Sequence, residues 1–143
     1  MNLHDAITFA TEHPVCFLAT ADADQPHVRG WLFWFADESG FYFQTLEPKD
    51  VYQQLRTNPK VEVCFYNGGD LSTAQTLRVT GSVEFLDDSA LRHRLVEEDM
   101  PFLAAVGDAD DPIHQIFRIH HGEAFIWGMG DMLKERELER ATF

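Results

Sequence analysis

The sequence lacks any apolar run that approaches the roughly 20 residues needed by a membrane-spanning helix. Its first residues, MNLHD, carry no basic group ahead of an apolar stretch, so they do not have the pattern of a signal peptide. We therefore expect a cytoplasmic protein with no membrane partner.

Basic residues are also scarce. Lysine and arginine number 11 against 24 aspartates and glutamates, which gives a formal net charge of −13. A negative field of that size repels nucleic acid and anionic membrane surfaces, so neither is an expected partner. Any anion that this chain binds must be held by local basic groups that work against the overall field.

Only two cysteines occur, Cys16 and Cys64, and both fall within apolar, strand-like segments. We expect buried free thiols here, and neither a disulfide nor a reactive thiol is supported. The seven histidines do not indicate a metal centre. His120 and His121 are adjacent, and neighbouring side chains of a strand point to opposite faces. No metal site is therefore predicted.

Signatures of the common catalytic classes are missing too. The sequence has no nucleophile elbow and no Ser-His-Asp spacing. Gly68 and Gly69 are not followed by the Gly-Lys-Ser/Thr of a phosphate-binding loop. No side chain stands out as an acid, a base or a nucleophile, so the catalytic residues stay unassigned.

What the chain does contain is apolar and aromatic residues, at 45% hydrophobic with 12 phenylalanines. That composition and a length of 143 residues predict one folded domain, residues 1–143, with a sizeable core. Period-two alternation predicts strands, and helical spacing predicts helices. The expected elements of the first half are a helix over 2–12, strands over 15–21, 27–36 and 41–45, a helix from Pro48 to 57, and strands over 61–66 and 77–85.

The second half is expected to begin with a helix over 87–99 and a helical continuation over 100–106. An acidic loop over 107–112 precedes a hairpin with strands over 113–121 and 123–129 that turns at Gly122. The charged tail, 131–143, is expected to be helical and either free or packed on a partner. Six or seven strands with peripheral helices indicate a mainly β fold, a small antiparallel barrel. Periodicity alone does not distinguish the kinds of small barrel.

Two basic residues stand where a phosphate group is expected. Lys49 falls in the first turn of the helix that Pro48 begins, where lysine is disfavoured because helix N-termini carry partial positive charge. A bound phosphate would explain that lysine. Arg29 lies in a neighbouring strand, and its planar guanidinium matches two phosphate oxygens. On this view neither residue is needed for folding. The alternative is that both are ordinary surface charges that face the acidic majority.

The order of these segments resembles the FMN-binding split-barrel family typified by pyridoxamine 5'-phosphate oxidase. The resemblance lies in VCFLAT at 15–20, QPHVRGW at 25–31, FYFQTLEPKD at 41–50 and NPKV at 58–61. It implies a six- to seven-stranded antiparallel split barrel that binds FMN at the interface of a homodimer. The strand over 28–35, apolar on both faces, independently indicates that homodimer.

The resemblance also implies a set of cofactor-binding residues. One group would bind the phosphate, the backbone after Arg29 would lie along the flavin, the end of the next strand would follow the ribityl chain and ring, and a partner subunit would add further residues. In that order the candidates are Arg29, Pro48 and Lys49; Gly30, Trp31 and Leu32; Phe43, Gln44 and Thr45; and Asn67, Gln75 and Trp127.

Two departures separate the chain from pyridoxamine 5'-phosphate oxidases themselves. Trp34 stands where a further lysine is expected, and ERELER at 135–140 does not resemble their Arg- and Trp-containing substrate segment. The sequence therefore favours another small flavoprotein, an FMN-dependent oxidoreductase that passes hydride or electrons to a small molecule. The alternatives are a non-catalytic flavin-binding, electron-transfer or sensor protein, and a split barrel that binds haem or a deazaflavin.

Overall fold

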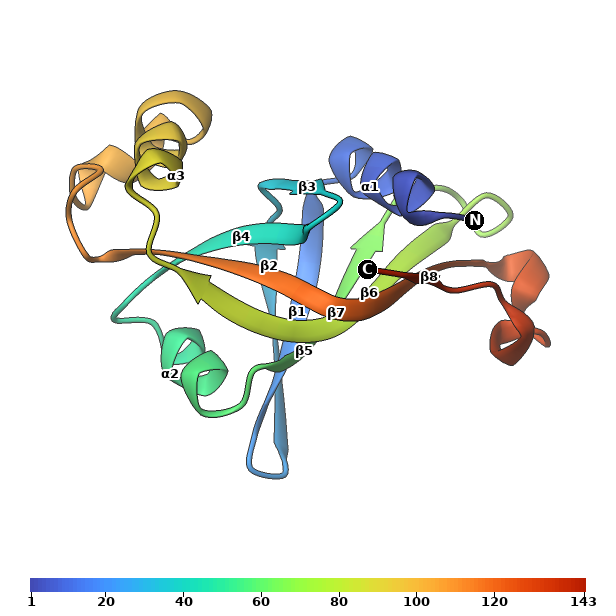
Figure 1. Cartoon of the computed structure of the whole chain (residues 1–143). Helices are drawn as coiled ribbons and strands as arrows, with labels where there is room; N and C mark the ends of the chain where they lie inside the picture. The colour runs from blue at the N-terminus through green and yellow to red at the C-terminus, as the bar shows by residue number, and fades with distance from the viewer.

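The computed structural model describes residues 1–143 and consists mainly of antiparallel sheet with helices at its edges (Figure 1). Its strands are β1 (Val15–Asp22), β2 (Gln25–Leu32), β3 (Phe35–Asp37), β4 (Gly40–Leu46), β5 (Lys60–Tyr66), β6 (Gln75–Leu86), β7 (His114–Gly128) and β8 (Ala141–Thr142). They hydrogen-bond in the order β2-β1-β5-β6-β7-β4-β3, and β8 pairs with β7 off this path. The predicted mainly β, antiparallel split barrel is confirmed, with eight strands instead of six or seven.

The helices are α1 (Leu3–Glu12), α2 (Asp50–Thr57) and α3 (Ser89–His93), with a π-helix η1 (Arg94–Asp99) and 3-10 turns η2 (Pro101–Ala105), η3 (Met129–Asp131) and η4 (Glu135–Glu137). α1 starts where predicted because Asn2 and Asp5 cap each other's backbone N–H groups. Its apolar side, which includes Phe9, covers one end of the core. None of these helices has the length and apolar character that crossing a bilayer requires.

Aromatic side chains fill the barrel. Phe41, Phe43, Phe65 and Phe117 are fully buried. The rings of Phe43 and Phe117 stack with their centroids 5.5 Å apart, and Trp31 meets both of them edge-on. Aromatic pairs in these geometries contribute about 0.5–1.5 kcal/mol each beyond the area that they bury. This packing fixes the inner faces of β2 and β4, the strands that carry seven of the twelve predicted FMN-binding residues.

The strand predicted over 27–36 is interrupted. β2 ends and β3 begins with Phe33 and Trp34 between them. Phe33 buries its ring and donates its N–H to the Pro14 carbonyl, whereas the Trp34 indole N–H donates to the Asp99 carboxylate at 2.7 Å. β2 and β3 lie at opposite ends of the strand order, so the chain turns a corner here. Alternation of apolar residues continues through the corner and does not reveal it.

The hairpin predicted at Gly122 is wrong, because β7 is one strand that pairs along its length with β6. Gly122 marks a bulge, where the register shifts between Thr80 and Ser82. A Cβ atom at Gly122 would lie 1.7 Å from the Thr80 carbonyl oxygen, and His121 has a φ of 50°. Glycine is therefore required by a close approach of two strands. From the sequence alone, a glycine required by such a close approach cannot be distinguished from a glycine in a turn.

The helical tail is also a wrong prediction. Residues 129–137 form two 3-10 turns, and the chain ends in β8 antiparallel to β7. The Arg140 guanidinium lies 4.1 Å from the centroid of the Phe125 ring, and it pairs with Glu123 at 3.9 Å. Arginine stacks well on an aromatic face. Arg140 of the tail therefore contacts this chain's own sheet.

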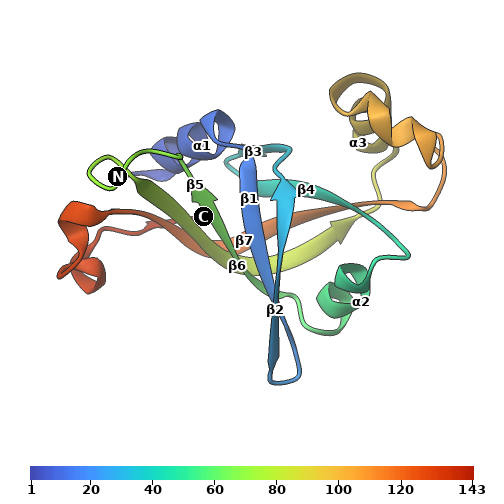
Figure 2. The same cartoon turned by 180° about the vertical axis from the view of Figure 1, so that it is seen from behind.

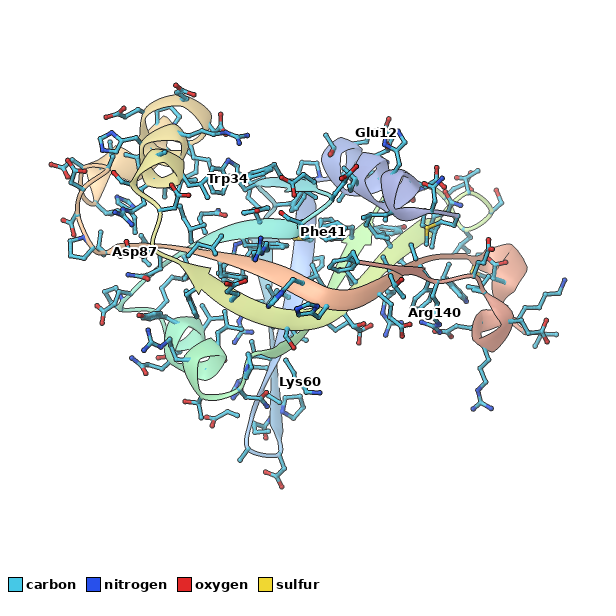
Figure 3. The ribbon with its side chains drawn as sticks, in the orientation of Figure 1. Glu12, Trp34, Phe41, Lys60, Asp87 and Arg140 are labelled. Atoms are coloured by element: carbon cyan, nitrogen blue, oxygen red, sulfur yellow. The ribbon has the colours of Figure 1, made fainter.

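The segment between β6 and β7, residues 87–113, is called the cap below. It contains α3, η1 and η2 and stands at one end of the β6–β7 ribbon, opposite the C-terminal turns (Figure 1). The small core of the cap consists of Leu95, Val96, Met100 and Ala109, packed on Ile116 of β7. Trp34, labelled in Figure 3, packs against this core from the β2–β3 corner. The predicted helix over 87–99 is present as a short α-helix that continues as a π-helix.

Candidate functional site

A hollow of about 230 Å³ lies between β2, β4 and the cap. Six of the predicted cofactor-binding residues line it, namely Gly30, Trp31, Leu32, Gln44, Thr45 and Lys49. β2 contributes the first three, β4 the next two, and the start of α2 the last. The fold thus brings three separate sequence segments to one place.

Gln44 and Thr45, two residues of this lining, each have a buried side-chain polar atom without a hydrogen-bond partner. The Gln44 amide nitrogen donates to the Leu32 carbonyl at 3.3 Å, but its Oε1 is buried and accepts no hydrogen bond. Thr45 Oγ1 is buried and unpartnered as well. Buried polar atoms are rarely left unpaired, and each costs about 1–3 kcal/mol when it is. A flavin nucleotide fits this need, because its ring and ribityl chain carry N–H and O–H groups.

Lys49 is the charged residue of the hollow. It is the N-cap of α2, which begins at Asp50, so Pro48 precedes the cap and is not the first helical residue as predicted. Its Nζ atom lies 5.4 Å from the centroid of the Trp31 ring. Lys49 takes part in none of the ion pairs of the chain. Its charge is therefore free for an anionic ligand.

Arg29 is held by the barrel. Its guanidinium donates to the Leu18 carbonyl at 3.2 Å, to the Thr20 hydroxyl at 2.9 Å and to the Gln54 side-chain carbonyl at 2.6 Å. Arg29 therefore ties β2 to β1 and to α2. These contacts indicate a structural role for Arg29 that the sequence-based expectation did not include, because the sequence does not show which atoms a strand arginine meets across a barrel.

A second hollow, of about 570 Å³, shares Lys49 with the first. Arg29, Pro48 and Gln54 are among its lining residues, and Asp50 is its one carboxylate. Burial lowers the pKa of Arg29, and the Asp50 carboxylate opposes that shift. Lys49 thus joins a mainly apolar hollow to one with a second cation and the N-terminus of α2, the end of a helix that favours anions.

Four predicted residues lie elsewhere. Phe43 points into the core, on the face of β4 opposite Gln44, so its side chain does not reach either hollow. Asn67, Gln75 and Trp127 gather at another part of the sheet, where Asn67 Oδ1 accepts the Gln75 backbone N–H at 3.0 Å. The Trp127 indole N–H is buried there without an acceptor. The assignment of these three residues to a partner's site stays a prediction.

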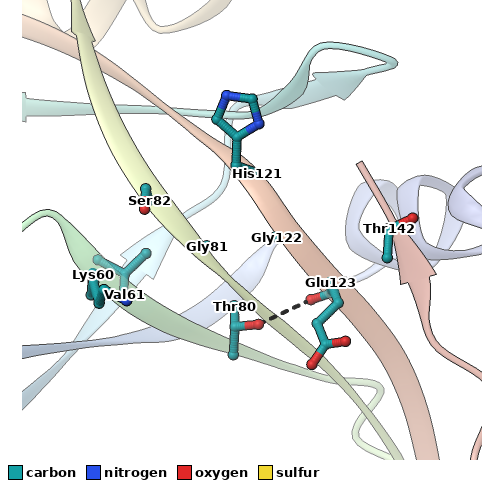
Figure 4. Close-up of a pocket in the computed structure, with 9 residues that line it drawn as sticks. All are labelled: Lys60, Val61, Thr80, Gly81, Ser82, His121, Gly122, Glu123 and Thr142. Atoms are coloured by element: carbon teal, nitrogen blue, oxygen red, sulfur yellow. Dashed lines mark hydrogen bonds between the residues drawn. The ribbon is translucent and has the colours of Figure 1, made fainter.

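Another hollow, of about 520 Å³, opens at the β6–β7 bulge (Figure 4). Lys60 and His121 line it, and the Thr80 hydroxyl donates to the Glu123 carbonyl across it at 3.4 Å. Val61 is its one apolar residue, and no unpartnered buried polar atom belongs to it. It therefore lacks the two features that point to a ligand in the first hollow.

The cap contributes residues to the first hollow that the sequence alone does not indicate. Phe102 and Leu103 of η2 line the first hollow beside Leu46. The signal that could have found them is a Pro-Phe-Leu triplet inside an otherwise acidic segment. No periodic pattern places that triplet next to β2 and β4, because the contact depends on how the π-helix before it ends.

Known proteins share both the sequence pattern and this fold. The profile described as pyridoxamine 5'-phosphate oxidase matches residues 4–128. No curated protein matches the sequence. A NimC/NimA family protein from Clostridium acetobutylicum is 28% identical, with a TM-score of 0.78 over 96% of this chain and 90% of that chain.

Two more distant structures share the fold alone. A FAD-binding protein from Mesorhizobium loti is 22% identical, with a TM-score of 0.64 over 87% of this chain and 94% of that chain. The haem storage protein HutZ from Vibrio cholerae is 18% identical, with a TM-score of 0.64 over 83% of this chain and 89% of that chain. One fold thus carries different cofactors, and the residues of the site must decide between them.

Proposed function

This chain belongs to the pyridoxamine 5'-phosphate oxidase family, and on that premise we propose that it is an FMN-dependent oxidoreductase that works as a homodimer. The observation that carries the proposal is the position of Lys49, which joins an apolar hollow with unpaired polar atoms to a second hollow that contains Arg29. FMN has the same division, with a largely apolar ring at one end and a phosphate dianion at the other.

Each part of FMN has residues suited to it. The Lys49 ammonium and the first N–H groups of α2 suit the phosphate, and Arg29 adds the N–H groups that its own contacts leave free. Gln44 Oε1 and Thr45 Oγ1 suit N–H and O–H groups of the ring and the ribityl chain. When bound, the flavin supplies hydride or electron transfer, and the protein binds, orients and shields it.

The outer face of β1 and β2 supports the homodimer. Four apolar side chains there are exposed, with Val15 at 64%, Phe17 at 50%, Val28 at 69% and Leu32 at 41%. Val15 lies opposite Leu32 in the ladder, so the four form a continuous surface on the hairpin seen in Figure 2. Exposed apolar surfaces of this kind mark interaction sites. Leu32 also lines the first hollow, so a second copy that covers this face would adjoin the flavin.

The lining of the hollow argues against haem as the cofactor. It includes no histidine, cysteine, methionine or tyrosine, the residue types that serve as axial ligands of haem iron. The competing function that fits the same residues is flavin binding without turnover, since Lys49 is the one titratable side chain in the lining.

Titration with FMN and with riboflavin tests the proposal. FMN should bind at least about tenfold more tightly, because the phosphate alone engages Lys49 and Arg29. The FMN-loaded protein should then oxidise NADH or NADPH in the presence of an electron acceptor. Equal affinity for FMN and riboflavin would contradict the phosphate site. FMN binding without oxidation of either donor would favour the non-catalytic function.

A further inference from the structure

We propose that the cap selects the substrate of the flavin, and that Phe102 makes it selective for uncharged aromatic molecules. The inference rests on the proposed function, since it concerns the space beside a bound FMN. Phe102 is 63% exposed, and yet it lines the same hollow as Trp31 and Gln44. A phenylalanine whose ring lines a hollow, and is not packed in a core, is available to stack on a ligand.

Neighbouring residues of the cap play a different part from Phe102. Leu103, the next residue, packs against the small core of the cap and so anchors η2. Phe102 belongs to neither core cluster of the protein. Its ring therefore does little for folding, and an exposed aromatic ring at the mouth of a cofactor hollow is best explained by contact with a ligand.

The support beneath Phe102 is fixed by specific contacts. Asp99, the last residue of the π-helix, accepts hydrogen bonds from the Trp34 indole at 2.7 Å and from Arg94 Nε at 2.8 Å. Arg94 in turn lies 4.2 Å from the centroid of the Phe35 ring. Phe102 follows Asp99 by three residues, after the break at Met100 and at the start of η2, so these contacts hold the chain just before Phe102 at the β2–β3 corner. π-helical segments occur frequently at functional sites.

Charge decides which aromatic molecules are favoured. The cap carries eight carboxylates against two arginines, so its surface repels an anion that approaches the hollow. Inside the hollow, Lys49 is the one charged residue, and the phosphate of FMN would engage it. An anionic substrate would therefore find no free cation, and a cationic substrate would find no carboxylate. The remaining walls, Trp31, Leu32, Leu46, Phe102 and Leu103, favour an uncharged ring.

Two probes of similar shape test this selectivity on the FMN-loaded protein. 2-Naphthol is uncharged at neutral pH, and 2-naphthoate is an anion. Binding is followed by the change that each causes in the visible absorption of the flavin. We expect 2-naphthol to bind at least about tenfold more tightly than 2-naphthoate, with a gap that narrows as salt is added.

Three variants assign the effect to Phe102. Because Phe102 lines the hollow that would also hold the flavin, the two affinities are compared: Phe102→Ala should weaken 2-naphthol binding about tenfold and FMN binding much less. Phe102→Leu should recover part of the loss. Val106→Ala is the matched control, because Val106 is an exposed apolar residue of the same cap that does not line the hollow, and it should change neither affinity.

The outcomes that overturn the inference differ from those that overturn the proposed function. Equal binding of the two probes, or full 2-naphthol binding by Phe102→Ala, would overturn the inference while FMN binding stands. A loss of FMN affinity in Phe102→Ala as large as its loss of 2-naphthol affinity would make Phe102 a wall of the cofactor site and would also overturn it. Failure of the unchanged protein to bind FMN would overturn the proposed function, and this inference with it.

Discussion

Lys49 holds its ammonium group over the indole of Trp31, with Nζ 5.4 Å from the ring centroid. The contact joins the two sides of the candidate site, because Lys49 caps α2 and Trp31 lies on the inner face of β2. A lysine over an aromatic face gains about 0.5–1 kcal/mol at an exposed site. A charge-assisted hydrogen bond to a phosphate gains more. Lys49 can therefore leave Trp31 for a phosphate at small cost.

Replacement of Lys49 by alanine should lower FMN affinity roughly tenfold to a hundredfold. The loss of a charge-assisted contact corresponds to about 1.5–3 kcal/mol. The melting temperature of the apo protein should change by only a few degrees, because Lys49 is exposed, makes no ion pair and loses only its contact with Trp31. Lys60→Ala is the control, since Lys60 is an exposed lysine at the distant hollow of the β6–β7 bulge. FMN titration at low and moderate salt measures both; equal affinities would rule out a phosphate contact at Lys49.

Arg29→Ala should destabilise the protein as well as weaken FMN binding. The substitution removes the arginine hydrogen bond to the Leu18 carbonyl and one of the two hydrogen bonds that Gln54 Oε1 accepts, the other coming from the Thr20 hydroxyl. Loss of hydrogen bonds from a charged donor costs about 1–3 kcal/mol. Urea unfolding of the apo protein measures this change in stability. Lys49→Ala serves as the comparison at the same site, because it should lose FMN affinity with a smaller loss of stability. Unfolding midpoints that coincide for the two variants would show that the contacts of Arg29 do not support the fold.

His93 should make the stability of the cap depend on pH. Its ring nitrogens lie 2.8 Å from the Asp110 carboxylate and 3.0 Å from that of Glu97, and these contacts raise its pKa, the hydrogen bond to Asp110 most. Because the pKa is raised in the folded state, the stabilisation is complete below the unfolded value, about 6.5, and is lost as the pH rises through the folded value.

Thermal unfolding of the unchanged protein and of His93→Gln tests that dependence. The unchanged protein should be more stable than the variant at about pH 5.5, and the difference should disappear at about pH 8.5. His4→Gln is the control, because His4 is an exposed histidine of α1 without an ion pair. A difference of the same size at both pH values would show that His93 acts without its charge.

The strands that the sequence predicts well are those with one buried face. β6 alternates because Leu77 and Val79 enter the core while Arg78 and Thr80 do not, so the pattern and the burial share a period of two. The local sequence does not reveal the role of Gly122, because that role depends on Thr80 of another strand. Local sequence does not record which strand lies opposite, so it does not separate a bulge from a turn.

The residues of the candidate site likewise differ in whether the local sequence reveals them. Gln44, Thr45 and Lys49 could be named in advance because a short, ordered motif carries them, and the resemblance to a family supplied their roles. The Phe102 contact and the Arg29 network could not, because each joins segments that are far apart in the chain. Their positions follow from how the cap and α2 pack on the barrel, which no short motif encodes.

Phe17→Lys should convert the proposed homodimer to a monomer. Phe17 is 50% exposed on the outer face of β1, between strands that carry Val28 and Cys64, so a lysine there would place a charge in the middle of the proposed interface. Its side chain lies outside the core cluster, so the monomer should stay folded. Light scattering measures the mass. Leu133→Lys is the control, because Leu133 is 94% exposed in the C-terminal tail, away from this face, and it should remain a dimer.

The same variant tests whether the flavin site needs both subunits. If Asn67, Gln75 and Trp127 act on a partner's cofactor, the Phe17→Lys monomer should bind FMN at least about tenfold more weakly, although its own Lys49 is intact. Asn67→Ala should weaken FMN binding while the dimer persists, which separates a missing contact from a missing subunit. A Phe17→Lys monomer with undiminished FMN affinity would show that one chain holds the complete site. A Phe17→Lys protein that is still dimeric would show that the copies meet through another face.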